Sequence, residues 1–200
     1  MGIRKSATRL TTTERDNFLK AVLTLKNTIA NPAAPAAQQI SIFDQFVAIH
    51  LYTININFGL DTGLNMGHGD SAFGPWHRYY LYQFEQALQT VDPTVTLPYW
   101  DWTDHFGTQN ILFQDNFLGP NGTISGIGGK SVMSGYFAFN KPGTAGNPTP
   151  LPPWYPATMN GWKVRPSLAQ GHTGATDPST GKTLQRNFSA FTSLETQSHV

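Results

Sequence analysis

The segment from Trp76 to Val91 constrains the fold more than any other part of this sequence. Its side chains form two stripes at helical spacing: Trp76, Tyr80, Phe84, Ala87 and Val91 in one, and His77, Leu81, Glu85 and Leu88 in the other. A helix that is apolar over so wide an arc is typical of the centre of a bundle. Pro75 suits the first turn, and Ser71 or Asp70 is a candidate cap. We therefore predict a helix that has Pro75 and His77 in its first turn and continues to Val91.

Two upstream segments also predict helices. The first runs from Thr11 to Ile29 and opens with a capping box, in which Thr11 is followed three residues later by Glu14. The second runs from Gln39 to about Ile54 and is amphipathic, with His50 on its apolar face. Together the three segments predict a mainly α fold.

The second half of the chain differs from the first in composition and in periodicity. Residues 105–183 are rich in Gly, Pro, Asn, Ser and Thr, which is typical of long irregular loops wrapped over a core. Helical spacing resumes at Gln185 and continues to the last residue without a cap. At 200 residues the chain fits one domain. The interrupted pattern predicts that the natural polypeptide continues beyond Val200 or was cut there.

Composition excludes several classes of function. With 13 basic and 12 acidic residues, the chain offers no electrostatic surface for nucleic acid or an anionic membrane. No apolar run reaches membrane-spanning length, and residues 1–30 lack the apolar core of a signal peptide, so the compartment stays open. The chain has no cysteine, which excludes disulfides and thiolate metal sites. Any metal must therefore bind His, Asp or Glu, and imidazoles suit copper, zinc, iron or nickel.

Three histidines have the spacing of a metal site. His50 and His77 come from predicted helices, and His68 lies in the glycine-rich loop between them. Taken singly, His50 could be a hydrogen-bonded core residue and His68 a surface residue. Three imidazoles around one ion leave open coordination positions, which a catalytic metal needs. Zinc in such a site would serve hydrolysis and copper would serve dioxygen chemistry, and the spacing alone leaves both open.

The surrounding motifs resemble a known family. The pattern H-x17-H-x8-H, with the last histidine inside FGPWHRYYLYQFE and followed by LPYWDW, resembles the first copper site of the tyrosinase family. This family of type-3 copper proteins includes catechol oxidases, aminophenol oxidases and molluscan haemocyanins. The opening IRKSATRLTTTERDNFLKAVLTLK is similar to the N-terminus of short bacterial members. The resemblance implies a four-helix-bundle dicopper core, of which this chain supplies part.

The resemblance also assigns roles to individual residues. It implies that His50, His68 and His77 bind the first copper, and that Phe73 and Trp76 pack around the site. It places Arg78, Glu85 and Asp101 at polar positions of the core or next to the ligands. Leu194-Glu195 is similar to the family's Leu-Glu before the second copper motif, whose glutamate is thought to hold a water that helps deprotonate a bound phenol. That similarity makes Glu195 a candidate catalytic residue.

The implied function is copper-dependent oxidation of phenols or catechols to o-quinones with dioxygen. The family's second copper needs an H-x3-H pair and a further histidine, but the remaining His105, His172 and His199 do not form this pattern. We therefore expect one copper from this chain and the second from a C-terminal remainder, with activity only when both are present. The alternatives are a haemocyanin-like reversible dioxygen carrier and an inactive half-domain. The bacterial-type N-terminus and the absence of cysteine argue against the carrier.

Overall fold

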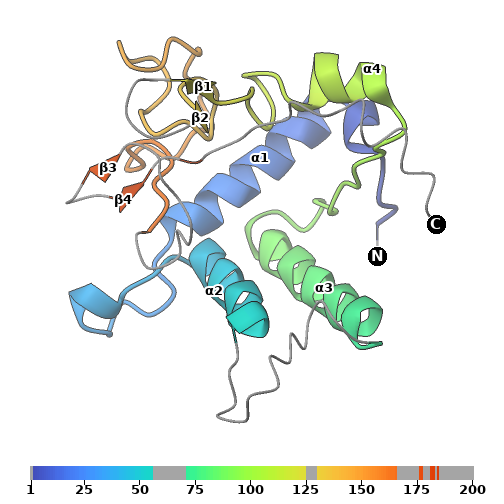
Figure 1. Cartoon of the computed structure of the whole chain (residues 1–200), viewed down its shortest axis with the longest axis vertical. Coiled ribbons are helices and arrows are strands. Elements are labelled where there is room, and N and C mark those ends of the chain that lie inside the picture. Colours follow the sequence, from blue (N-terminus) through green and yellow to red (C-terminus); the bar gives the residue numbers. More distant parts are fainter. Residues whose placement is uncertain are drawn as a thin grey trace. The chain divides into compact units, whose positions relative to one another are not determined.

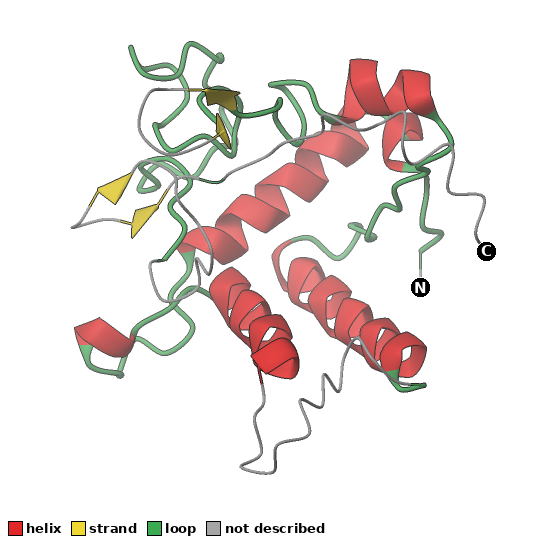
Figure 2. Ribbon diagram, in the orientation of Figure 1, coloured by secondary structure: helices red, strands yellow, loops and turns green. Residues whose placement is uncertain are grey.

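The computed structural model describes residues 2–55, 71–124, 130–165, 176–177, 181–182 and 184. The chain divides into two compact units. The first comprises Met1–Arg4 and Asp16–Leu97, and the second comprises Lys5–Arg15 and Pro98–Val200. Helices are the long elements (Figure 2), and within the described ranges each β-strand has two residues. The prediction of a mainly α fold with long irregular loops is confirmed.

Helix α1 (Thr12–Asn27) begins as its sequence predicts. The backbone N–H of Thr11 donates to Glu14 Oε2 over 2.9 Å, and the Glu14 N–H donates to Thr11 Oγ1 over 3.2 Å. These two reciprocal bonds are a capping box, so this prediction is confirmed. The helix ends two residues before the predicted Ile29. Its buried side chains are Phe18, Leu19, Ala21, Val22, Leu23 and Leu25.

Helix α2 (Ile42–Asn55) follows a 3-10 turn at Ala36–Gln38 and lies in the first unit. Ser41 caps its N-terminus, because Ser41 Oγ accepts the N–H of Asp44 over 3.0 Å. Lys26 Nζ of α1 lies 2.5 Å from Asp44 Oδ1, and both side chains are largely buried. This ion pair ties α2 to α1.

Helix α3 (Phe73–Val91) contains the predicted segment and has Pro75 in its first turn, as expected. Pro75 is its third residue, where the missing N–H costs no intrahelical hydrogen bond. His77 consequently lies in the second turn instead of the first. Ala72 occupies the N-cap position in helical conformation and makes no side-chain capping hydrogen bond, so Ser71 is not the N-cap, and Asp70 lies outside the described residues.

Helices α2 and α3 lie side by side in the first unit (Figure 1). Their ring contacts are Phe43 with Phe84 at 5.9 Å, and Phe46 with Phe84 at 5.1 Å and Tyr80 at 5.8 Å between centroids. Residue numbers rise along α2 as those of their partners fall along α3, so the helices are antiparallel. Edge-on packing of these aromatic side chains supplies much of the interface.

The second unit contains short elements joined by loops. A bridge joins Ser6 to Tyr99, flanked by Ala7 N–H to Tyr99 O at 2.8 Å and Tyr99 N–H to Lys5 O at 3.0 Å. The elements of this unit are η1 (Ala7–Arg9), α4 (His105–Gly107), the π-helical η3 (Thr108–Leu112), and the antiparallel pairs β1 (Thr123–Ile124) with β2 (Lys130–Ser131) and β3 (Thr176–Asp177) with β4 (Gly181–Lys182).

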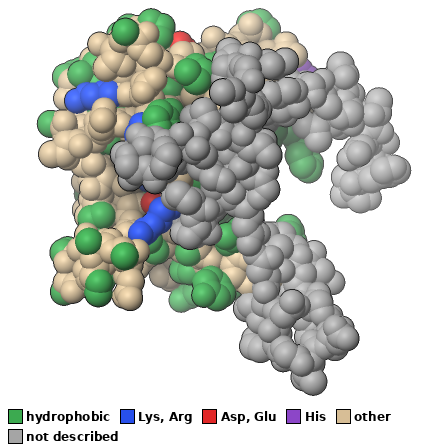
Figure 3. All heavy atoms as spheres, turned by 60° about the vertical axis from the view of Figure 1, so that its left-hand side comes forward, with side chains coloured by type: hydrophobic (Ala, Val, Ile, Leu, Met, Phe, Trp, Pro, Cys, Tyr) green, Lys and Arg blue, Asp and Glu red, His purple; other side chains and the backbone are tan. Residues whose placement is uncertain are grey.

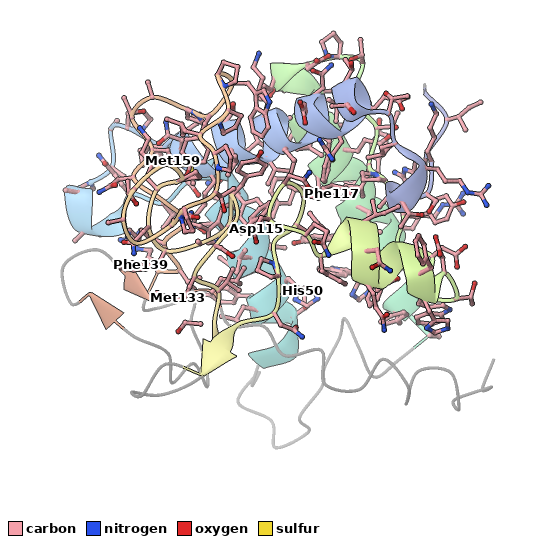
Figure 4. The ribbon with its side chains drawn as sticks, turned by 90° about the horizontal axis from the view of Figure 1, so that it is seen from above. His50, Asp115, Phe117, Met133, Phe139 and Met159 are labelled. Carbon is pink, nitrogen blue, oxygen red and sulfur yellow. The ribbon has the colours of Figure 1, made fainter. Side chains whose placement is uncertain are left out.

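Hydrogen bonds from side chains connect the loops of the second unit. Asp115 accepts hydrogen bonds from Ser134 Oγ at 2.8 Å and from Thr149 Oγ1 at 3.2 Å. The buried Asn147 amide donates to the carbonyls of Gly135 and Asn140. Figure 4 labels Asp115 and the fully buried Phe117 in this loop region. Buried loop backbone is satisfied in this way without long strands.

Charged residues are few in this chain, with 13 basic and 12 acidic among 200. On the face seen in Figure 3, basic and acidic side chains are sparse among the residues that are coloured. Along the parts of the chain that the structure describes, no helix combines the length and apolar character needed to cross a membrane.

Candidate metal centre

The structure brings two of the three predicted ligands together. His50 projects from α2 and His77 from α3, with ring centroids 5.7 Å apart and ring planes at 74°. Figure 4 labels His50 on α2. Metal–imidazole bonds are about 2.0–2.1 Å long, so two rings on one ion must have centres within roughly 6 Å of each other. The observed separation meets this requirement.

Local structure orients the His77 ring. Its Nδ1 lies 2.8 Å from the backbone oxygen of Phe73, one turn earlier in α3. A carbonyl only accepts, so Nδ1 carries the proton and donates it. The lone pair is then on Nε2, which is the tautomer that binds a metal through Nε2.

Aromatic rings surround the two imidazoles. The Phe73 and Trp76 rings lie 4.3 Å and 4.7 Å from the His77 ring, as the resemblance implied for these two residues. Trp76 also lies 6.0 Å from the His50 ring, and Tyr80 lies 5.9 Å from it. These rings form an aromatic border beside the imidazoles, which themselves remain partly exposed.

Tyr80 is a residue that the sequence analysis placed only in an apolar stripe. Its hydroxyl donates to the backbone oxygen of Phe46 on α2 over 2.9 Å. Burial raises the pKa of Tyr80 above its usual value, so the hydroxyl keeps its proton. The spacing of residues along α3 does not predict this hydrogen bond, because its acceptor lies on another helix.

The three polar positions of the resemblance differ in their surroundings. Glu85 is buried at 4% exposure, and its Oε2 accepts Arg4 Nε over 2.6 Å and the Leu97 N–H over 3.0 Å. Asp101 is partly exposed, and hydrogen bonds from the Thr103 hydroxyl and N–H lower its pKa. Only Glu85 therefore has the buried, paired environment expected for all three positions.

Arg78 lies on a different side of α3 from His77. It is exposed and lines an open hollow of about 700 Å³ with Gly74, Pro75, Tyr79 and Tyr82. Consecutive helix residues point about 100° apart, which explains why Arg78 does not share the surroundings of its neighbour. The expectation that Arg78 is a buried charge next to the ligands was wrong.

Other predicted site residues fall outside the described ranges. His68, the third proposed ligand, and Glu195, the proposed catalytic residue, are among them, as are His172, His199 and the helix predicted from Gln185. Within the described part of the chain, no group of three or more His, Cys, Asp or Glu side chains is placed to hold an ion. His105 is the first residue of α4 and is partly exposed.

The fold and this pair of residues define a class: a mainly α protein with two neighbouring imidazoles on antiparallel helices and aromatic rings beside them. Residues 40–198 match the common central domain of tyrosinase, and the chain belongs to the tyrosinase family.

Individual relatives agree with this assignment. Grixazone synthase of Streptomyces griseus is 44% identical over 138 residues, which are 68% of this chain and 40% of that protein. The tyrosinase of Streptomyces glaucescens is 39% identical over 69% of this chain and 44% of its own. A solved structure of a variant polyphenol oxidase from Thermothelomyces thermophila superposes with a TM-score of 0.54 and 25% identity, covering 92% of this chain and 48% of its own. The chain thus spans less than half the length of each.

Proposed function

We propose that this chain carries the first copper site of a dicopper phenol or catechol oxidase, with His50, His68 and His77 as the ligands. The observation that carries the proposal is the His50–His77 pair, whose rings are 5.7 Å apart, with the Nδ1 of His77 engaged by a carbonyl. Membership of the tyrosinase family, and relatives named tyrosinase and polyphenol oxidase, support copper over zinc.

Copper bound by these imidazoles would supply redox chemistry between dioxygen and a phenolic ring. One phenol and one dioxygen give one o-quinone and one water. Two catechols together lose four electrons and four protons, and one dioxygen accepts them to give two waters. The substrate class we propose is therefore a small phenol or catechol.

The chain's own residues would prepare this chemistry. The Phe73 carbonyl holds His77 in the tautomer with Nε2 free, and Trp76 and Tyr80 lie beside the ligands. Glu195, by its resemblance to the family glutamate, would hold a water that accepts the proton of a bound phenol. A carboxylate can do this only when ionised, which near-neutral pH provides.

We further propose that the second copper comes from a C-terminal remainder of the enzyme. Three of the six histidines are assigned to the first site, and His105, His172 and His199 do not have the H-x3-H spacing of the second. On this proposal residues 1–200 are the N-terminal part of one copper-binding domain. Oxidase activity then needs both parts.

The test is a measurement of copper binding by the 200-residue chain, followed by an oxidase assay. After equilibrium dialysis against Cu(II), the chain should retain one copper, and His50→Ala and His77→Ala should each lose it. His105→Ala is the control and should retain it. With a catechol and dioxygen, the chain alone should give no quinone, and addition of the second-copper half should give it. Failure of the folded wild-type chain to retain copper would refute the proposal.

A further inference from the structure

The hydrogen bond between Tyr80 and Phe46 links the two helices at the level of the two histidines. Phe46 lies four residues before His50, so its carbonyl is one helical turn from the ligand. Tyr80 lies three residues after His77, again about one turn away. The bond therefore joins the ligand-bearing turn of α2 to the ligand-bearing turn of α3.

The ring of Tyr80 is itself held in place. It stacks on Trp76 with centroids 5.0 Å apart and planes within 14° of parallel, and it lies 5.9 Å from the His50 ring. Trp76 in turn contacts both imidazoles. The Tyr80 hydroxyl, so held, donates to the Phe46 carbonyl over 2.9 Å.

We propose that Tyr80 is a positioning residue for the metal site: its hydroxyl fixes the spacing of His50 and His77 by holding α2 against α3. This inference rests on the proposed function: the Tyr80–Phe46 hydrogen bond would hold the two ligands in position before copper binds. The aromatic contacts between Phe43, Phe46 and Phe84 pack the two helices edge-on and contain no hydrogen bond. A hydrogen bond is directional, and it selects one register.

The affinity for copper depends on how many molecules already have His50 and His77 in the binding arrangement. Copper binds the arrangement in which the imidazoles already converge, and its apparent affinity falls with the fraction of molecules in that arrangement. Without the hydroxyl, that fraction decreases while the helices stay folded. Removing one such hydrogen bond corresponds to about a 3- to 10-fold loss of affinity.

The experiment is a titration of the full 200-residue chain with Cu(II) against a competing chelator, for wild type and Tyr80→Phe. We expect Tyr80→Phe to bind copper about 3- to 10-fold more weakly. Its Cu(II) electron paramagnetic resonance lines should also broaden, because the ligand geometry becomes less uniform. Tyr82→Phe, which removes a hydroxyl from an exposed position of the same helix, should bind as wild type does.

A second variant separates positioning from stability. Leu88 is fully buried eleven residues after His77, so Leu88→Ala lowers stability without touching the site. It should leave copper affinity and line widths unchanged below its unfolding midpoint. The inference is overturned if Tyr80→Phe binds copper as tightly as wild type, or if Leu88→Ala loses as much affinity. Absence of copper binding by wild type would instead refute the proposed function.

Discussion

Arg4 and Glu85 are 81 residues apart in sequence, yet the Arg4 Nε donates to Glu85 Oε2 over 2.6 Å. The carboxylate also accepts the N–H of Leu97, so one buried side chain joins the N-terminal segment, α3 and the segment that follows it. Hydrogen bonds to a buried charge contribute more than neutral ones because the alternative is an unpaired charge away from water.

Arg4→Met is therefore expected to destabilise the protein by about 1.5–3 kcal/mol, since it leaves the Glu85 carboxylate with one partner fewer. Urea denaturation gives the free energy of unfolding. The double variant Arg4→Met/Glu85→Gln should cost less than the sum of the two single variants, because the two side chains share one interaction. Strict additivity would contradict the pairing.

The Lys26–Asp44 pair predicts a larger effect because both side chains are largely buried. Lys26→Met should destabilise the protein by about 3 kcal/mol, since it leaves the Asp44 carboxylate without its cation. Lys26→Met/Asp44→Leu removes both charges and should recover most of the loss. The comparison is made by thermal and urea unfolding, and a double variant less stable than Lys26→Met would contradict it.

The capping box at Thr11 and Glu14 predicts a dependence of stability on pH. The hydrogen bond from the Lys5 side chain, followed by those from Thr11, lowers the pKa of Glu14 from 4.5 to about 2. Because the folded pKa is the lower one, Glu14 stabilises the fold fully above pH 4.5. That contribution is lost progressively as the pH falls from 4.5 towards 2.

Glu14→Gln should therefore be less stable than wild type at pH 7, and the difference should shrink as the pH falls below 4.5. Unfolding free energies measured at both ends of this range test the prediction. Thr11→Ala is the matched variant: it removes the reciprocal cap and should destabilise at both pH values, by about 1 kcal/mol. A Glu14→Gln difference that stays constant with pH would contradict the assignment.

Two glycines predict opposite outcomes for the same substitution. Gly161 has φ of +78°, and a Cβ there would overlap the carbonyl of Phe139. Gly161→Ala should therefore destabilise the protein by more than about 1 kcal/mol. Gly74 lies in α3 with open space around the position of a Cβ, so Gly74→Ala should stabilise by about 0.5–1 kcal/mol. Equal effects in a thermal unfolding assay would contradict this reading of the backbone.

Local patterns predicted the helices well and their ends less well. The capping box of α1 involves only Thr11 and Glu14, which are three residues apart. It could therefore be predicted from the sequence alone. Helix α3 instead begins at Phe73 without a side-chain cap, and its first turn is preorganised by Pro75. Ser71 precedes this start in the sequence but does not occupy the N-cap position, so a polar residue near a helix start did not by itself identify the cap.

The His50–His77 pair of the candidate site was also predictable, because it follows from the spacing of residues along each helix. The spacing of α2 and α3 places His50 and His77 each on one face, and antiparallel packing brings them together. The partners of the side chains depend on tertiary contacts that spacing does not encode. The Tyr80–Phe46 bond and the exposure of Arg78 are of this kind, because each depends on how α3 is rotated against its neighbours.

The bridge between Ser6 and Tyr99 has a consequence for biosynthesis. Residues 5–7 are translated before their backbone partner Tyr99, which lies 93 residues after Ser6. At about 5–20 residues per second, the intervening stretch takes roughly 5–20 s to synthesise. During that interval Lys5 to Ala7 have no strand to pair with, and their amide groups remain hydrated. Residues 5–7 thus reach their final place only after a segment that is translated much later than they are.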